Sequence, residues 1–176
     1  MAKNLLAGFK FFNEVPPETI EAIDQKGELL EFGPGDVIFH IDEPARHLYG
    51  LVEGEVDLSI VFKDKVLKTE IEYEEAIQAR MVDEEKSIVI DTVLPNQIFG
   101  WASLVGSDRR TVTARCAEPT RVISLSAKDL KAMFAEDYFL GYVVMTRLAD
   151  IIARRLKNRT DKLIETWVEA FDGDAI

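Results

Sequence analysis

The segment from residue 28 to residue 125 is divided into short apolar runs by residues that favour turns. One turn cluster, Phe-Gly-Pro-Gly-Asp at 32–36, directly precedes an apolar run. Apolar and polar residues alternate at 56–60 and again at 111–116, which is the period of half-buried strands. Many short strands joined by regular turns indicate a barrel or a sandwich, because no strand–helix–strand alternation favours a parallel sheet.

Helical patterns flank these strands. Val-Pro-Pro-Glu-Thr at 15–19 is typical of a helix start, since proline suits the first turn and glutamate the positive end of the helix dipole. Ser126 and Asp129 form a capping-box pattern that predicts a helix over about 127–135. A longer helix is predicted over about 138–171, where one stripe contains Leu148, Ile152, Leu156, Leu163 and Trp167.

The long helix raises a question of partners, because about 30 residues exceed what one small core needs at roughly 1.5 Å of rise each. Either part of it packs on another chain, or it bends back onto its own barrel. Residues 147–162 carry six basic residues against two acidic ones. This basic stretch is interpreted as an exposed helix face or as a surface that binds an acidic segment of a second copy.

Composition excludes several classes of function. The 176 residues fit one domain, and 21 basic against 32 acidic residues give a net charge of −11, which disfavours a dedicated nucleic-acid-binding protein. A lone cysteine, Cys116, excludes an internal disulfide and a cysteine-rich zinc site. His40 and His47 are not a closely spaced metal-binding pair. No signal peptide or membrane span is visible, so we expect a cytoplasmic protein that is not an enzyme.

Residues 99–114 contain the candidate binding site. A strand ends at Phe-Gly, a small-residue turn enters a short helical segment, and Arg109 and Arg110 precede the next strand. Backbone N–H groups at such a turn can bind an anion, and an arginine can complete the site with a charge-assisted fork. The residues small enough to let an anion approach are Gly100, Ala102 and Ser103.

Strand parity distinguishes the two arginines. Arg110 falls on the same side as Val112, Ala114 and Cys116, whereas Arg109 falls on the side of Thr111. Parity therefore favours Arg110 as the arginine that points into the barrel, although a bulge would reverse the assignment and keeps Arg109 as the alternative.

Together these motifs resemble the cyclic-nucleotide-binding domain of catabolite-activator-type regulators, protein kinase A regulatory subunits and cyclic-nucleotide-gated channels. The similarity covers about residues 11–159 and includes the segments at 11–16, 33–39, 49–56 and 99–110. It implies a mainly β fold, a double-stranded β-helix jelly roll with an N-terminal helix and long C-terminal helices. It also implies a regulatory sensor that binds cyclic AMP, cyclic GMP or a related anionic ligand.

Position by position, the resemblance implies a phosphate-binding cassette made of Gly100, Trp101, Ala102, Ser103, Arg109 or Arg110, and Thr111. Arg110 matches the arginine that pairs with the cyclic phosphate. Trp101 stands where the family has a glutamate that hydrogen-bonds the ribose 2′-hydroxyl, and an indole offers one donor and no acceptor. The cassette is therefore degenerate. Three outcomes stay open: weak nucleotide binding, another anionic ligand stacked on Trp101, or a plugged pocket in a scaffold that binds only proteins.

The resemblance also exposes an insertion, because about 20 residues more than the family usually needs lie between Gly54 and Phe99. The insertion, about residues 64–91, is acidic, and its part at 73–81 could form a short helix or an extended hairpin. We interpret it as a solvated surface excursion, with a partner-docking flap or a lid near the pocket as alternatives.

The expected organisation is one domain over 1–176, with a helical segment at 1–27, a jelly roll at 28–125 and helices at 126–176. We expect a homodimer through the long helix, which would shift when ligand closes the cassette. Only about ten residues follow Glu165, so no DNA-binding domain is expected, and the downstream protein partner is not indicated.

Overall fold

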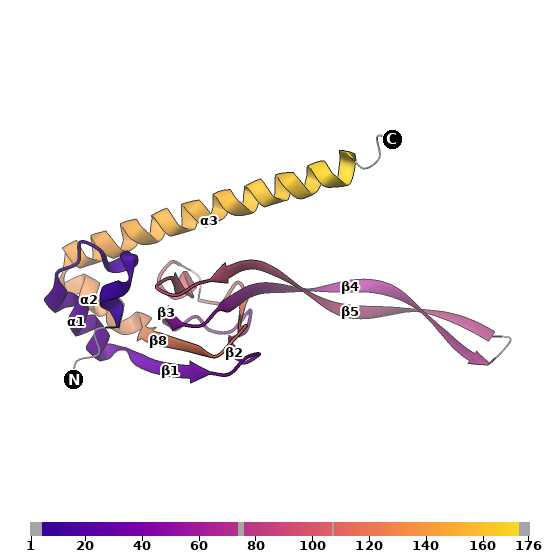
Figure 1. The fold of residues 1–176 in the computed structure, drawn as a ribbon, viewed down its shortest axis with the longest axis horizontal. Helices are drawn as coiled ribbons and strands as arrows, with labels where there is room; N and C mark the ends of the chain where they lie inside the picture. Colours follow the sequence, from indigo (N-terminus) through magenta and orange to yellow (C-terminus); the bar gives the residue numbers. More distant parts are fainter. Residues whose placement is uncertain (1–4, 74–75, 107, 173–176) are drawn as a thin grey trace.

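The computed structural model describes residues 5–73, 76–106 and 108–172, and it shows two four-stranded antiparallel sheets (Figure 1). The first sheet has the order β1-β8-β3-β6. Its strands are β1 (Glu28–Phe32), β8 (Thr120–Ser126), β3 (His47–Glu53) and β6 (Ile98–Phe99). Tyr49 of β3 lies opposite Ser124 on one side and Phe99 on the other, so the end of the edge strand β6 is fixed beside Tyr49.

The second sheet has the order β2-β7-β4-β5. Its strands are β2 (Val37–Phe39), β7 (Thr113–Cys116), β4 (Val56–Tyr73) and β5 (Ala76–Val93). The predicted mainly β jelly roll with flanking helices is therefore confirmed. The alternating run predicted at 111–116 is a strand only from Thr113, because the chain turns at Thr111 and Val112.

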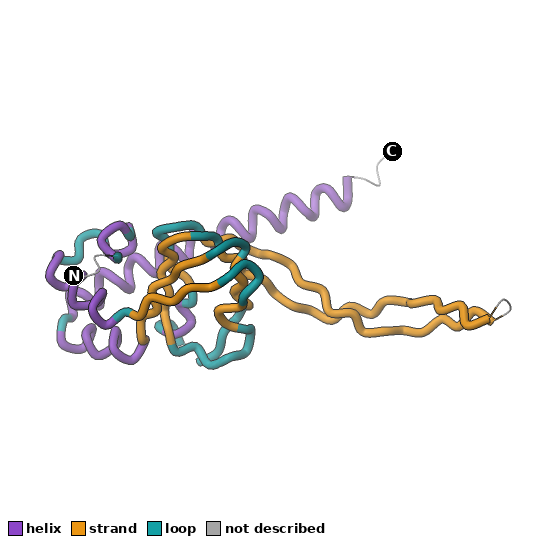
Figure 2. Tube along the Cα trace, turned by 60° about the horizontal axis from the view of Figure 1, so that its bottom comes forward, coloured by secondary structure: helices purple, strands orange, loops and turns teal. Residues whose placement is uncertain are grey.

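The acidic insertion forms a hairpin and not a helix. β4 pairs with β7 only through Ser59, and beyond this residue β4 and β5 continue as a two-stranded arm over 60–73 and 76–88. Figures 1 and 2 show the arm projecting away from the roll. Glu74 and Glu75, at the turn, lie outside the described residues.

Most of the helical elements lie at one end of the roll, and the longest helix extends from there past the roll (Figure 1). The helical elements are the 3-10 turns η1 (Leu6–Gly8), η2 (Lys10–Phe12) and η3 (Trp101–Ser103), and the α-helices α1 (Pro17–Lys26), α2 (Ala127–Glu136) and α3 (Tyr138–Asp172). The capping box predicted for α2 forms, since the Ser126 Oγ accepts a hydrogen bond of 3.3 Å from the backbone N–H of Asp129.

Helix α3 is continuous and divides into two parts by burial. Its first part packs on the roll and the N-terminal helices through Leu140, Val143, Val144 and Leu148. In the second part, from Leu156 to Val168, every residue is exposed, and the end of the helix extends beyond the roll (Figure 1). The helix does not bend back onto its own barrel.

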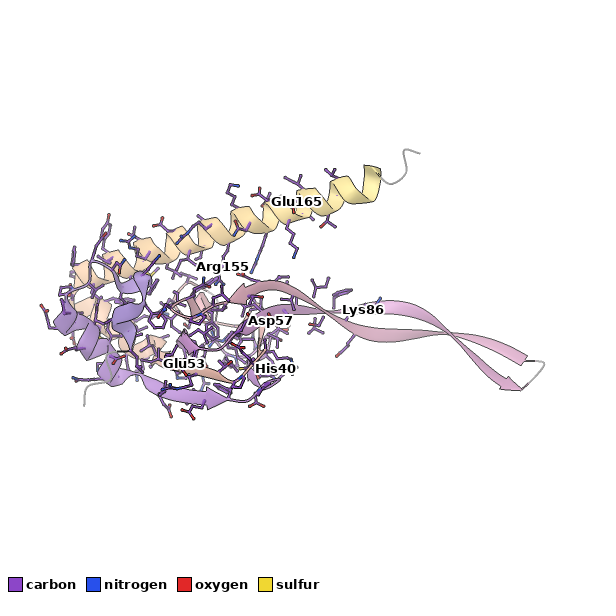
Figure 3. The ribbon with its side chains drawn as sticks, viewed as in Figure 1. His40, Glu53, Asp57, Lys86, Arg155 and Glu165 are labelled. Carbon is purple, nitrogen blue, oxygen red and sulfur yellow. The ribbon has the colours of Figure 1, made fainter. Side chains whose placement is uncertain are left out.

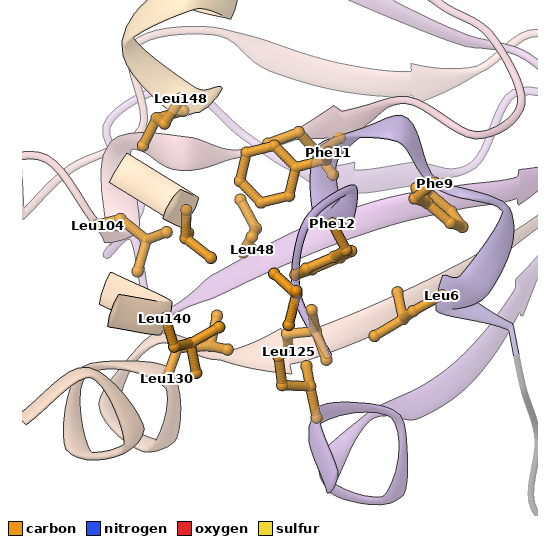
Figure 4. Packing of buried hydrophobic residues seen from close by; sticks show 14 of the residues in the cluster. Leu6, Phe9, Phe11, Phe12, Leu48, Leu104, Leu125, Leu130, Leu140 and Leu148 are labelled. Atoms are coloured by element: carbon orange, nitrogen blue, oxygen red, sulfur yellow. The ribbon is translucent and has the colours of Figure 1, made fainter. Parts of the chain in front are cut away.

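Two hydrophobic clusters hold these parts together. One joins the helices to the first sheet, and Figure 4 shows Phe11, Phe12 and Leu48 in it beside Leu148 of α3. The other lies between the sheets and contains Phe39, Tyr49 and Phe99, whose rings stack with centroids 5.3–6.1 Å apart. The candidate site lies where the roll meets α3.

Candidate functional site

A cavity of about 210 Å³ lies between the roll and α3. Its described lining residues come from β2, β4, η3, the loop before β7 and α3. They are Phe39, Leu58, Gly100, Trp101, Ala102, Arg110, Thr111, Val112, Ile152, Arg155, Leu156 and Arg159. Three of these residues are arginines and none is an acid, so the cavity is a basic site in an acidic chain.

Arg110 is buried in the wall that the roll contributes, with 3% of the residue exposed. Its Nη1 donates a hydrogen bond of 2.7 Å to the carbonyl of Gly100, and its Nη2 donates one of 2.9 Å to the carbonyl of His47. The guanidinium carbon lies 4.2 Å from the centroid of the Phe39 ring and 5.4 Å from that of Tyr49. Burial lowers the pKa of Arg110, and these rings and carbonyls offset part of the cost of burying its charge.

Gly100 has to be glycine for two reasons. Its φ is +76°, in the left-handed region that residues with a Cβ rarely adopt. A Cβ built there would also lie 2.8 Å from Arg110 Nη1 and 3.0 Å from Tyr49 Cδ2. The absence of a side chain therefore lets the Arg110 guanidinium approach the Gly100 carbonyl.

Arg109 lies outside the cavity. It is exposed, and its Nη1 donates a hydrogen bond of 2.7 Å to the carbonyl of Asp42. The structure thus places Arg110, not Arg109, on the inner side with Ala114 and Cys116, as parity favoured. Strict alternation is not kept, because Thr113 is also buried and accepts a hydrogen bond from the N–H of Ile41 through its hydroxyl.

Of the other candidate residues, three line the cavity and one lies behind its wall. Trp101, Ala102 and Thr111 line the cavity beside Gly100 and Arg110. Ser103 is buried and does not line the cavity, since its N–H and its hydroxyl both donate to the carbonyl of Gly100, at 3.4 Å and 3.2 Å. The Ser103 N–H is therefore already engaged, although an anion was expected to dock on it.

Trp101 forms one side of the cavity and contacts α3 through Arg155. The Arg155 guanidinium carbon lies 4.5 Å from the centroid of the indole ring. Arg155 Nε also makes an ion pair of 3.1 Å with Asp91 Oδ2 of β5. Figure 3 shows Arg155 between α3 and the roll. Burial lowers the pKa of Arg155, the Asp91 carboxylate opposes this, and the neighbouring Arg159 adds to it.

Sequence reasoning missed the wall that α3 contributes. Ile152, Arg155, Leu156 and Arg159 were not among the candidate site residues, and Arg155 was assigned to an exposed basic face. Its side chain is only 14% exposed. A signal was present, because Arg155 follows Leu148 by seven residues and Ile152 by three, which places a charged residue on the buried stripe of the helix.

Two features, a membrane-spanning helix and a metal-binding cluster, are not found in the part of the chain that the structure describes. None of the described helices has a stretch long and apolar enough to cross a bilayer. Likewise, no group of three or more His, Cys, Asp or Glu side chains within the described ranges is placed to hold a metal ion.

Comparison with known proteins identifies the family of this fold and cavity. Residues 29–137, which include most of β1, the cassette and α2, match the family model described as "Cyclic nucleotide-binding domain". The chain belongs to the cyclic nucleotide-binding domain family. In CRP-like regulators, domains of this family are sensors and not enzymes.

The curated relatives of this cyclic nucleotide-binding domain are distant. The CRP-like cAMP-activated global transcriptional regulator of Mycobacterium tuberculosis is 21% identical over 161 residues. The match covers 92% of this chain and 61% of that regulator. The chain thus spans less than two thirds of the length of the curated relatives it matches.

Solved structures share the architecture. A protein from Geobacter metallireducens GS-15, named as a candidate cyclic nucleotide-binding protein, superposes with a TM-score of 0.64 at 27% identity, over 88% of this chain and 97% of that one. A cyclic nucleotide-binding domain from Methylobacillus flagellatus KT gives a TM-score of 0.67 at 18% identity, over 93% and 83%. The likeness to the second structure shows the fold alone.

Proposed function

We propose that this cyclic nucleotide-binding domain binds cyclic AMP or a related anionic ligand in the cavity and relays occupancy through α3. The observation that carries the proposal is the cavity's position between the cassette and α3. A ligand there would touch Arg110 on the roll and Ile152 and Arg155 on the helix. If α3 can occupy two positions relative to the roll, a ligand that makes better contacts with one of them would raise the population of that position.

Electrostatics favour an anion as the occupant. The chain carries a net charge of −11, yet three arginines and no acid are found among the described residues that line the cavity. An arginine fork recognises phosphate and carboxylate groups with geometric specificity. The cavity would therefore select an anion from solution although the protein as a whole repels one.

Trp101 limits how well the cavity would hold cyclic AMP. The indole offers a donor but no acceptor for a ribose hydroxyl. Hydrogen bonds to charged groups contribute about 1.5–3 kcal/mol, so we expect cyclic AMP to bind about one to two decades more weakly than it would with a carboxylate at position 101. The proposal therefore includes other anions beside cyclic AMP and cyclic GMP.

The test is calorimetric titration of cyclic AMP, cyclic GMP and cyclic dinucleotides into the purified chain. Denaturation and mass spectrometry first establish whether a small molecule co-purifies. Arg110→Lys keeps a cation but loses the fork, and it should weaken binding at least tenfold. Hydrogen exchange across α3, measured with and without ligand, reports whether the helix responds.

Arg109→Gln is the matched control, because Arg109 is the adjacent arginine in the chain and lies outside the cavity. It should bind ligand as the wild type does. If neither these nucleotides nor other small anions produce heat at millimolar concentration, and nothing co-purifies, the sensor proposal fails. A domain that docks only proteins would then be the remaining interpretation.

We also propose that two copies of the chain pair through the second part of α3. Leu156, Leu163 and Trp167 are exposed by 65%, 59% and 59%, although such side chains are usually buried. Their spacing of seven and then four residues is typical of a two-stranded coiled coil, in which a helix packs against a copy of itself. The dimer would cover an apolar stripe that the monomer leaves in water.

Sedimentation equilibrium of wild type, Leu163→Glu and Lys162→Glu tests this pairing. Leu163→Glu should dissociate the dimer because it places a charge in the apolar seam. Lys162→Glu changes an exposed residue beside the seam and should leave the dimer at least partly intact. A monomeric wild type at all micromolar concentrations would contradict the proposal.

A further inference from the structure

Two arginines that line the cavity each have a buried nitrogen without a hydrogen-bond partner. They are Nε of Arg110 and Nη1 of Arg155. A buried donor left unpaired costs about 1–3 kcal/mol, and more when the group is charged. Unpaired buried donors are uncommon, so these two nitrogens are candidate partners for acceptors of a ligand or of water in the cavity.

The two arginines lie on different elements. Arg110 precedes β7 in the roll, and its two Nη atoms are already held by carbonyls. Arg155 belongs to α3, and its Nε is already paired with Asp91. One anionic group of ordinary size satisfies one guanidinium fork. A ligand with a single anionic group would therefore leave the buried nitrogen of one of the two arginines without a hydrogen-bond partner.

The environment of Arg155 can accommodate a second negative charge. Asp91 is its only ion-pair partner among the described residues, whereas Arg159 repels it from the next turn of the helix. Trp101, against which Arg155 is stacked, is neutral and brings no competing carboxylate. An anion that reached Arg155 would meet one acid behind it and two further arginines, Arg110 and Arg159, around the same cavity.

We propose that the ligand of this cavity is a small dianion, with one anionic group on Arg110 and the second on Arg155. This inference rests on the proposed function and narrows its ligand class. The shared chemistry is two carboxylates or two phosphates on a short frame. Because Arg155 belongs to α3, the second group would tie the helix to the roll only when a dianion is bound.

Matched ligands and matched variants test the second anionic group. The ligands are dicarboxylates from malonate to adipate, each beside its monomethyl ester, together with pyrophosphate beside methyl phosphate, and cyclic AMP in parallel. The best dianion should bind wild type at least tenfold more tightly than its singly charged counterpart. Comparison of the dicarboxylates with pyrophosphate shows whether the cavity prefers carboxylate or phosphate groups.

Arg155→Gln should remove that preference, and Arg155→Lys should keep part of it. Arg154→Gln is the control, since Arg154 is the preceding arginine of α3 and lines a neighbouring groove instead of this cavity. Asp91→Asn should keep or increase the preference, because it breaks the ion pair but leaves Arg155 available. Circular dichroism and thermal unfolding verify that each variant folds, and Arg155→Lys replaces Arg155→Gln in the test if the latter does not.

The outcomes separate this inference from the function on which it rests. Binding that depends on Arg110 but is equal for mono- and dianions, or is unchanged in Arg155→Gln, overturns the dianion and leaves the sensor. Equal loss of the preference in Asp91→Asn and Arg155→Gln also overturns it, because the ion pair would then act only in positioning α3. No binding of any anion to wild type overturns the proposed function and the dianion together.

Discussion

The two walls of the cavity hold their arginines in different ways. In the roll wall, Arg110 is bound to two backbone carbonyls and lies against the rings of Phe39 and Tyr49. In the helix wall, the contacts of Arg155 within the described part of the chain are with side chains, the Asp91 carboxylate and the Trp101 ring. Backbone carbonyls of strands and turns are fixed by the sheet, whereas a side chain can change its rotamer without a change in the backbone.

This difference indicates which wall can move. The roll wall is part of the stacked aromatic cluster between the two sheets, so displacing Arg110 would disturb the core. The helix wall lies where the burial of α3 ends, and beyond Leu156 the described part of the helix is exposed. A sensor needs one fixed contact and one adjustable contact, and we expect Arg110 to provide the first and Arg155 the second.

The largest expected effect comes from removing each arginine in turn. Arg110→Met removes the two buried hydrogen bonds to the Gly100 and His47 carbonyls, and we expect the free energy of unfolding to fall by about 3 kcal/mol. Arg155→Met breaks one largely buried ion pair and one ring contact, but the Asp91 side chain left behind is 27% exposed and can be hydrated, so we expect a smaller loss of about 2 kcal/mol. Urea unfolding measures both. Equal losses would show that the two walls are equally fixed.

The second prediction tests the close approach in the roll wall. Gly100→Ala should lower the free energy of unfolding by about 2–3 kcal/mol, from the positive φ and from contact with Arg110 and Tyr49. Gly106→Ala is the control, because Gly106 also has a positive φ of +63° but no atom of the described residues beyond its chain neighbours lies within 4 Å of its Cβ position. It should cost only about 1 kcal/mol. A similar loss in both variants would mean that the close approach carries no cost.

The third prediction concerns the helix wall alone. Trp101→Ala removes the ring on which Arg155 is stacked, and a cation–π contact contributes about 0.5–2 kcal/mol. Amide hydrogen exchange in α3 around Ile152 and Arg155 should accelerate by about tenfold, while exchange in β3 stays unchanged. Faster exchange in both elements would contradict the independence of the two walls.

The smallest effect is a pH dependence confined to the roll. Burial raises the pKa of the Cys116 thiol above its ordinary value of 9.0 and that of the Tyr49 phenol above 10.0. Both groups therefore ionise more readily in the unfolded chain, so stability is full below about pH 9 and declines as pH rises further. Chemical unfolding at several alkaline pH values should give a shallower decline for Cys116→Ala, whereas Arg155→Met should keep the wild-type slope.

Much of the fold was predictable because it depends on local patterns. Alternation marked β4 at 56–60, the capping box marked the start of α2, and the apolar stripe marked α3 almost to its end. Parity placed Arg110 on the inner side although the regular strand begins only at Thr113. The form of the insertion was left open because the period of residues 73–81 suits neither a helix nor a hairpin decisively.

The site was only half predictable for a physical reason. The cassette is continuous in sequence, so its small residues and its arginines could be recognised as one motif. The opposite wall comes from α3, about 45 residues later, and its distance from Trp101 depends on how the helix packs on Leu48 and Phe11. No local pattern reports that packing.

The sequence by itself determined the jelly roll, the helices at its ends and an arginine directed into the core. Hydrophobic periodicity and turn chemistry depend on residues that are close together in the chain, so they can be recognised from the sequence. Only the tertiary structure decided that Arg155 is stacked on Trp101, paired with Asp91 and placed across a cavity from Arg110. These contacts join three separate segments, and they form only when burial of the apolar stripe sets α3 against the roll.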